Sequence, residues 1–396
     1  MNLIDCIVQF RAEIQAIRRD LHAHPELAYE EHRTSDTVAQ LLAGWGIDVH
    51  RGLGGTGVVG VLRNGSGRRS IGLRADMDAL PIAEANGFGH ASKHAGRMHA
   101  CGHDGHTAML LGAARYLAET RPFDGTVNLI FQPAEEGGAG ARKMIDDGLF
   151  ERFPCDAVFG MHNWPGIRVG QFATTPGPMM ASGNRFEITV TGRGAHAAMP
   201  HLGVDPVFVG LQIAQGLQGI VTRSKKPLDP VVLSITMIRA GDAINVIPDA
   251  AVISGGVRTL DATVTDLIEE RMRQIAQLTA EAHGASANVI FDRYYPATVN
   301  DPAQAAFAAA VAGDMVGRDN VLADYEPSMG SEDFSYMLQA CPGAYVFIGN
   351  GDGAHRLAGH GEGPCMLHNP SFDFNDELIP IGATFWVRLV EKFLAR

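Results

Sequence analysis

Several features that would place the chain in a special class of proteins are missing from its sequence. None of its apolar runs approaches the roughly 20 residues that a membrane-spanning helix needs. The first 20 residues carry Asp5 and Glu13 within an apolar stretch, which argues against a signal peptide and favours an amphipathic helix. There is no internal repeat and no low-complexity segment in the 396 residues. We therefore expect a globular protein that does not associate with a membrane.

Positive charge and cysteine are also scarce. The 32 Lys and Arg residues are outnumbered by 44 Asp and Glu residues, which gives a net charge of −12, and no basic block stands out. Clustered basic residues are what nucleic acids and anionic lipids bind, so we expect neither as a partner. The five cysteines are odd in number and unpatterned, which argues against a disulfide framework and favours the reducing cytoplasm. Histidine is plentiful, with 16 residues, and this directs attention to metal ligands.

The chain is long enough for two or three domains. Its first part alternates helical and strand-like segments, a rhythm typical of an α/β sheet with helices on both faces. Strands expected over 57–62 and 70–75 flank Asn64-Gly65, which is a hairpin signal. From about residue 182 the expected order becomes βαββαβ, a complete α+β unit of the ferredoxin-like type.

We therefore predict an α/β, mixed-sheet catalytic domain over 1–181 and 298–396, interrupted by an inserted α+β domain over 182–297. Ligands of such sheets bind in the loops beyond the carboxyl ends of the strands. Asp76, Asp78 and His162 fall at such positions.

The densest group of chemically active residues is His99-Ala100-Cys101-Gly102-His103-Asp104-Gly105-His106. A thiolate and an imidazole two residues apart can reach one metal ion, so Cys101 and His103 are candidate ligands. His106 is either a ligand-supporting residue or the start of a helix. Taken alone, this pattern is equally compatible with a polar loop that binds nothing.

Two adjacent carboxylates, Glu135 and Glu136, follow the apolar segment VNLIF and the residues Gln132-Pro133-Ala134. One carboxylate can bind a cation while the other acts as a general base. His162 and His368 each stand alone in the sequence, and a single histidine is usually a core or surface residue. The metal-site prediction therefore depends on all of these residues occurring together.

With these residues taken together, the sequence resembles the N-acyl-amino-acid amidohydrolase branch of the di-metal aminoacylase and carboxypeptidase family, near hippurate hydrolases and plant auxin-conjugate hydrolases. The matching stretches lie between residues 18 and 376: RRDLHAHPELAYEE, GLRADMDALPI, MHACGHDGHTAMLLGAA, FQPAEEGGAGA, GMHNWP, GAHAAMP, INVIPDAAVISGGVRT, MGSEDFSYM and LHNPSFDFND. The resemblance implies two divalent metal ions, zinc or manganese with nickel or cobalt as alternatives. The ligands that it implies are Cys101, His103, Glu136, His162 and His368.

Further roles follow from the same resemblance. Cys101 is implied as the ligand that bridges the two ions, Glu135 as the general base, and Asp78 as the residue that orients a ligand. Asp76 stands where other relatives carry a histidine, which leaves the sharing of ligands between the ions open. His22, His24, Pro25 and Glu26 match a family signature, and we interpret them as structural.

The inserted domain is implied to complete the site. His196 matches a histidine that stabilises the oxyanion, in relatives across a dimer interface, so we expect a homodimer or a dimer-based oligomer. Asn245 and Arg258 match positions that hold the carboxylate side of the substrate, and Gly330 and Ser331 are expected to line the same pocket.

The predicted function is hydrolysis of the amide of a small N-acyl amino acid, hippurate-like, by metal-bound hydroxide with Glu135 as base. A dipeptidase or carboxypeptidase of the same family is the nearest alternative. A hydrolase with Cys101 as nucleophile and a binding protein without catalysis are the others.

Overall fold

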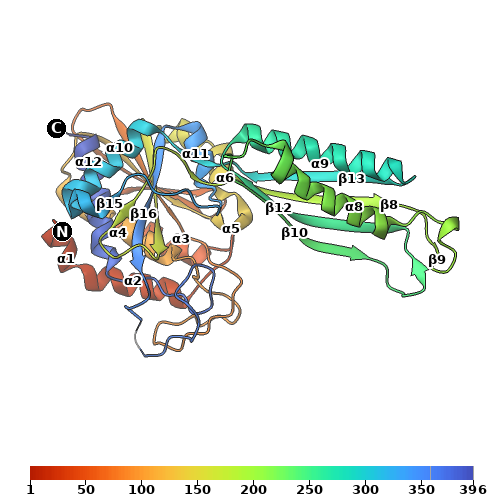
Figure 1. The fold of residues 1–396 in the computed structure, drawn as a ribbon. Coiled ribbons are helices and arrows are strands. Elements are labelled where there is room, and N and C mark those ends of the chain that lie inside the picture. Colours follow the sequence, from red (N-terminus) through yellow and green to blue (C-terminus); the bar gives the residue numbers. More distant parts are fainter. Residues whose placement is uncertain (357, 396) are drawn as a thin grey trace. The chain divides into compact units, whose positions relative to one another are not determined.

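The structure is a computed structural model that describes residues 1–356 and 358–395. The chain divides into two compact units (Figure 1). The first comprises Met1–Met179, Val299–Glu326 and Asp333–Arg396, and the second Met180–Thr298 and Pro327–Glu332. Within the described ranges, every helix is too short or too polar to traverse a lipid bilayer.

A mixed eight-stranded sheet runs through the first unit. Its spatial order is β1 (Asp48–Leu53), β2 (Gly57–Asn64), β4 (Gly125–Gln132), β3 (Ser70–Asp76), β5 (Ala157–Pro165), β16 (Gly343–Gly351), β6 (Phe172–Ala173) and β15 (Val321–Leu322). Strands β4, β3, β5 and β16 are parallel neighbours in the middle. They are covered on both faces, as parallel strands usually are, and every residue of β3 is buried. The short strands β7 (Gly177–Met180) and β14 (Thr298–Asn300) pair separately.

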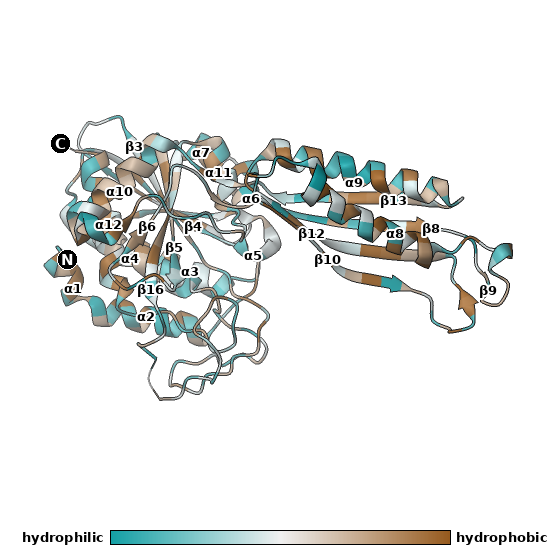
Figure 2. Ribbon diagram, viewed as in Figure 1, coloured by the Kyte–Doolittle hydropathy of each residue, from teal (hydrophilic) through white to brown (hydrophobic). Residues whose placement is uncertain are grey.

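Helices of the first unit cover this sheet. They are α1 (Asp5–Gln9), α2 (Arg11–Ala23), α3 (His32–Gly44), α4 (His103–Thr120), α5 (Glu135–Gly138), α6 (Gly140–Asp146), α7 (Leu149–Arg152), α10 (Pro302–Val316), α11 (Phe334–Ala340) and α12 (Leu378–Phe393), with a 3-10 turn at Arg318–Asn320. Helix α4 is buried along most of its length and packs against α2 and α12. In Figure 2 the central strands are mainly brown, whereas α2 alternates teal and brown as an amphipathic helix does.

The hairpin predicted at Asn64-Gly65 is wrong. Strands β2 and β3 do not pair with each other, because β4 lies between them, antiparallel to β2 and parallel to β3. A two-residue turn cannot bridge that gap. Instead, residues 65–69 cross the end of β4, where the amide of Gly67 donates to Asp124 Oδ1 at 2.7 Å. The apolar residues of β3 are all buried in this central position, which a hairpin at the edge would not provide.

The second unit contains a four-stranded antiparallel sheet in the order β10 (Val231–Ala240), β12 (Ala250–Thr259), β8 (Gly183–Thr191) and β13 (Ser286–Tyr295). Helices α8 (Pro206–Gly219) and α9 (Ala262–Ala282) share an apolar core with one face of it. The chain order is the predicted βαββαβ, and the predicted α/β fold class with a second α+β unit is confirmed. The remaining elements are β9 (Ala195–His196), β11 (Val246–Ile247), a 3-10 turn at Pro200–Leu202 and a π turn at Ile220–Ser224.

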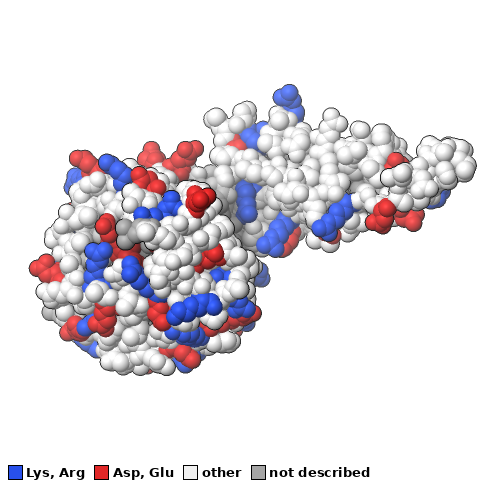
Figure 3. Space-filling model, turned by 90° about the horizontal axis from the view of Figure 1, so that it is seen from below, with Lys and Arg blue, Asp and Glu red and all other residues white. Residues whose placement is uncertain are grey.

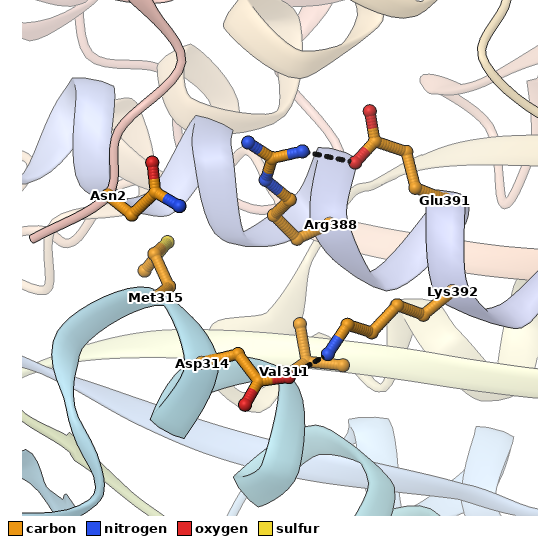
Figure 4. Close-up of a pocket in the computed structure, with 7 residues that line it drawn as sticks. All are labelled: Asn2, Val311, Asp314, Met315, Arg388, Glu391 and Lys392. Atoms are coloured by element: carbon orange, nitrogen blue, oxygen red, sulfur yellow. Dashed lines mark hydrogen bonds and ion pairs between the residues drawn. The ribbon is translucent and has the colours of Figure 1, made fainter.

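The surface of the first unit is mixed in charge, and residues of both signs intermingle on the face shown in Figure 3. A cavity of about 240 Å³ opens beside α10 and α12. Figure 4 shows its charged rim, where Arg388 pairs with Glu391 and Lys392 with Asp314. None of the predicted site residues is among those that line it.

Candidate metal centre

Three neighbouring parallel strands carry predicted site residues at their carboxyl ends. Asp76 is the last residue of β3, and Asp78 follows two positions later. Glu135 and Glu136 come soon after β4, and His162 lies near the end of β5. Because β4, β3 and β5 are adjacent in that order, these ends meet at one edge of the sheet.

Cys101 and His103 reach the same edge from the start of α4. Gly102 between them has φ +92°, a left-handed conformation that glycine adopts without strain. The side-chain amide of Asn163 donates to the carbonyl of Cys101 at 2.7 Å. The turn before the helix is therefore anchored to the residue that follows His162.

His368 arrives from a long loop near the C-terminus. Its backbone N–H donates to the carbonyl of Ala100 at 2.8 Å, which places it directly beside the Cys101 loop. Its φ is +61°, a conformation that costs a non-glycine residue roughly 1–2 kcal/mol. The surrounding contacts must therefore hold this residue in place.

The five predicted ligands converge. In one group Cys101, His103 and His162 offer ligand atoms that all lie within 4.8 Å of one another, and in a second Cys101, Glu136 and His368 do so. Cys101 is common to both groups. A third group joins His103 to Glu135 and Glu136. This is the arrangement that two neighbouring cations with one shared thiolate would need.

Asp78 connects two of these residues. One carboxylate oxygen lies 3.2 Å from His103 Nδ1, and the other accepts the backbone N–H of Glu136 at 2.9 Å. A carboxylate on one imidazole nitrogen leaves the other nitrogen directed at a metal, a common arrangement in metalloproteins. His103 Nε2 is buried and has no hydrogen-bond partner among the described residues.

Burial and negative charge shape the protonation of the group. Burial, together with the carboxylates of Glu136 and Glu135, raises the pKa of the Cys101 thiol well above its usual value. Burial lowers the pKa of His103, but Asp76 and Asp78 outweigh it and raise that pKa to about 10. Burial and the neighbouring His106 lower the pKa of His162.

A divalent cation fits this donor set. It would satisfy His103 Nε2, which lies 3.7 Å from Asp76 Oδ2 without a hydrogen bond. It would also offset the clustered carboxylates, and a coordinating thiol loses its proton outright. Thiolate, imidazole and carboxylate are also the ligand types that zinc takes. The residues present therefore suit the metal that the sequence predicts.

His106, offered by the sequence as a supporting residue or the start of a helix, lies in the first turn of α4. Its Nδ1 lies 2.6 Å from Asp76 Oδ1, and its Nε2 accepts the backbone N–H of Asn163 at 2.9 Å. A supporting residue that was not identified from the sequence is Arg74, which is fully buried and contacts Asp76 and Asp333 at 2.8 and 3.1 Å. A charged residue inside the otherwise apolar segment IGLRA was the available signal for Arg74.

Within the second unit, the predicted substrate contacts form two pairs. His196 on β9 faces Val246 of β11, and the carbonyl of Asn245 accepts the N–H of Ala197 at 3.0 Å. Arg258 donates to the hydroxyl of Ser331 at 2.7 Å, beside Gly330.

These two pairs lie at opposite ends of the sheet. Asn245 lies five residues before the first residue of β12, and Arg258 is the second-to-last residue of that strand. At about 3.3 Å per residue the strand separates them by roughly 25 Å. One chain therefore does not bring the two pairs together.

Comparisons with known proteins give a consistent result. The family model described as "Peptidase family M20/M25/M40" matches residues 72–392. The "Hippurate hydrolase" of Campylobacter jejuni is 41% identical over 394 residues, which cover 100% of both chains. "IAA-amino acid hydrolase ILR1-like 4" of Arabidopsis thaliana is 39% identical and covers 96% of this chain and 85% of its own. The structure of the YXEP protein of Bacillus subtilis, titled "a Dinuclear Metal Binding Peptidase from M20 Family", superposes with a TM-score of 0.83 at 34% identity and covers 98% of this chain and 99% of that one.

Proposed function

The chain belongs to peptidase family M20/M25/M40, and from this membership we propose that it cleaves the amide bond of small N-acyl amino acids with the help of two divalent metal ions. It is a hydrolase of the amidohydrolase branch. A hippurate-like, aroyl-linked amino acid is the substrate we favour, because the relative named for hippurate matches over its full length.

The observation that carries the proposal is the convergence of Cys101, His103, Glu136, His162 and His368 beside Glu135. Five donors from four separate stretches of the chain meet at one strand edge. Cys101 belongs to two of the groups, so we propose it as the shared ligand. Zinc suits the thiolate best, and manganese, cobalt and nickel suit the remaining donors.

The two ions, when bound, supply Lewis acidity that polarises the amide carbonyl and acidifies a water molecule. Glu135 accepts the proton of that water on its carboxylate and returns it to the leaving amine. Asp78 holds His103 and the backbone of Glu136 in place for this. Because Glu135 must carry a proton, it cannot at the same time be a full metal ligand.

Recognition of the substrate falls to the second unit. Arg258 offers a planar pair of N–H donors to a carboxylate, with Ser331 and Gly330 beside it. His196 donates to the developing oxyanion, with Asn245 nearby. Since the two pairs lie at opposite ends of β12, one small substrate can meet both only if two copies of the chain each supply one pair. We therefore propose a homodimer.

The test is a panel of N-acyl amino acids assayed with metal-free protein to which Zn²⁺ or Mn²⁺ is restored. We expect release of the free amino acid from N-benzoylglycine, loss of activity with a chelator and recovery with added metal. Activity that survives chelation but is lost on thiol alkylation would instead support Cys101 as a nucleophile. Cleavage of unblocked dipeptides in preference to N-acyl compounds would support the dipeptidase alternative.

A further inference from the structure

Helix α2 carries a buried arginine for which the proposed reaction has no use. Arg18 has no exposed surface. Its Nε lies 2.8 Å from Asp104 Oδ2. Its two terminal nitrogens donate to Asp373 Oδ1 at 2.7 Å and to Asp376 Oδ1 at 3.3 Å. One guanidinium thus contacts three carboxylates.

Those carboxylates belong to the two segments that carry the proposed metal ligands. We call them the His103 loop (residues 99–104) and the His368 loop (residues 352–377). Asp104 directly follows His103 in the first turn of α4. Asp373 and Asp376 follow His368 in the His368 loop. The two loops meet again at the hydrogen bond from the backbone of His368 to Ala100. The guanidinium is therefore a second connection between the two segments that carry His103 and His368.

His22, one helical turn after Arg18, reinforces the same contact. Its Nδ1 lies 2.9 Å from Asp104 Oδ2 and its Nε2 lies 3.1 Å from Glu84 Oε1. The His22 ring and both carboxylates are buried or nearly so. Buried charges are stable only when they are paired and hydrogen-bonded, so moving either partner away from His22 would be costly.

The His368 loop needs such an anchor. Between β16 and α12 the described residues form only turns and bends, so no sheet or helix holds His368 in its left-handed conformation. Backbone strain of this kind persists only where surrounding contacts fix it. The ion pairs to Asp373 and Asp376 are contacts of that kind.

We propose that Arg18 is a positioning residue of the metal centre, which fixes the His103 loop and the His368 loop relative to each other so that their ligands share the same ions. This inference rests on the proposed metal role of those histidines. A purely structural arginine would affect the stability of the fold and leave the affinity for metal unchanged in the folded protein.

The test compares Arg18→Lys with the matched control Arg19→Lys. Lysine keeps the charge but cannot contact three carboxylates in a planar fork. Arg19 is the next residue, is half-exposed, and among the described residues pairs only with Asp376. Metal-free protein is titrated with Zn²⁺ against a chromophoric chelator. Separately, Co²⁺ is added and the thiolate-to-cobalt charge-transfer absorption from Cys101 is recorded.

We expect Arg18→Lys to weaken Zn²⁺ binding about 10- to 100-fold, the usual effect of removing a partner of a ligand, and to alter the cobalt absorption. Arg19→Lys should stay within about twofold of the wild type, as exposed ion pairs contribute little. Wild-type Zn²⁺ affinity in folded Arg18→Lys would overturn the inference, whether or not the melting temperature falls.

A second variant covers the case in which Arg18→Lys does not fold. Asp376→Asn removes one of the three carboxylate contacts at a partly exposed position, and we expect it to weaken Zn²⁺ binding by more than Arg19→Lys does. Equal affinities in Asp376→Asn and Arg19→Lys would overturn the inference. Failure of the wild type itself to bind two Zn²⁺ ions would overturn the proposed function instead, so the two failures are distinct.

Discussion

Glu135 and Glu136 are neighbours in the chain, yet their surroundings differ. Glu136 is half-buried, and its carboxylate lies 3.1 Å from His368 Nε2. Glu135 is only 6% exposed and follows Ala134, whose left-handed backbone is held by a hydrogen bond from its N–H to Glu31. This contrast supports the proposed division of work, with Glu136 as ligand and Glu135 as base.

The first prediction concerns that division. Glu135→Gln should keep both metal ions and lower kcat by about 10²- to 10⁴-fold, because the amide cannot accept a proton. Glu136→Gln, the matched control, should lose metal. Kinetics combined with elemental analysis of the purified proteins checks both. Ordinary turnover by Glu135→Gln would remove it from the role of base.

The second prediction concerns the dependence of stability on pH. Burial alone would lower the pKa of His22, but Asp104 and Glu84 outweigh burial and raise it from 6.5 to about 9. Because its pKa is higher in the folded state, protonated His22 stabilises the fold. This stabilisation is complete below about pH 6.5 and is lost as the pH rises through about 9. This shift means that protonated His22 contributes on the order of 3 kcal/mol to the free energy of unfolding.

Urea denaturation at about pH 6 and about pH 9.5 measures this contribution. The wild type should lose stability over that interval, and His22→Gln should lose less. His24→Gln serves as the control, because His24 is partly exposed and contacts only Asp20 among the described carboxylates. A pH profile of His22→Gln that parallels the wild type would contradict the assignment.

At the scale of elements, the turn into α4 is the most constrained feature of the site. Gly102 combines a positive φ with close packing, since a Cβ there would collide with the side-chain amide of Asn163. Gly166 has the same φ of +92° but open space around it. Substituting alanine at Gly166 therefore tests backbone strain alone, whereas alanine at Gly102 would also displace the side chain of Asn163.

The third prediction uses this pair. Gly166→Ala should cost about 1–2 kcal/mol of stability from backbone strain and leave metal binding unchanged. Gly102→Ala should cost more, and should also weaken Zn²⁺ binding, because Asn163 supports both the Cys101 carbonyl and His106. Equal effects of the two substitutions on metal affinity would show that the packing of Gly102 is irrelevant to the site.

Single elements were predictable where a local signal decides them. The sequence offered His106 as the start of a helix, and α4 begins three residues earlier, at His103. The amphipathic helix expected in the first 20 residues is instead broken at Phe10 into α1 and α2. The hairpin predicted at Asn64-Gly65 failed because strand pairing depends on the rest of the sheet, here on β4, which begins 60 residues later.

At the scale of the whole molecule, His196 and Arg258 lie near opposite ends of β12, and this separation leads to the fourth prediction. Glu135→Gln and His196→Ala should each be nearly inactive alone. When the two are co-expressed, random assembly makes half the dimers hybrid, and each hybrid has one intact site, so about a quarter of wild-type activity should return. A mixture that stays inactive would place His196 in the site of its own chain.

The family and the candidate metal ligands were evident in the amino-acid order, because motifs such as HACGHDGH and QPAEEGG are short and local. The fold class was predictable as well, because the apolar residues of a helix or a strand recur with the period of that element. The convergence of the ligands, the burial of Arg18 and Arg74 and the position of β4 between β2 and β3 were decided by tertiary structure alone. They depend on contacts between residues far apart in the chain, and such contacts leave no local pattern in the sequence.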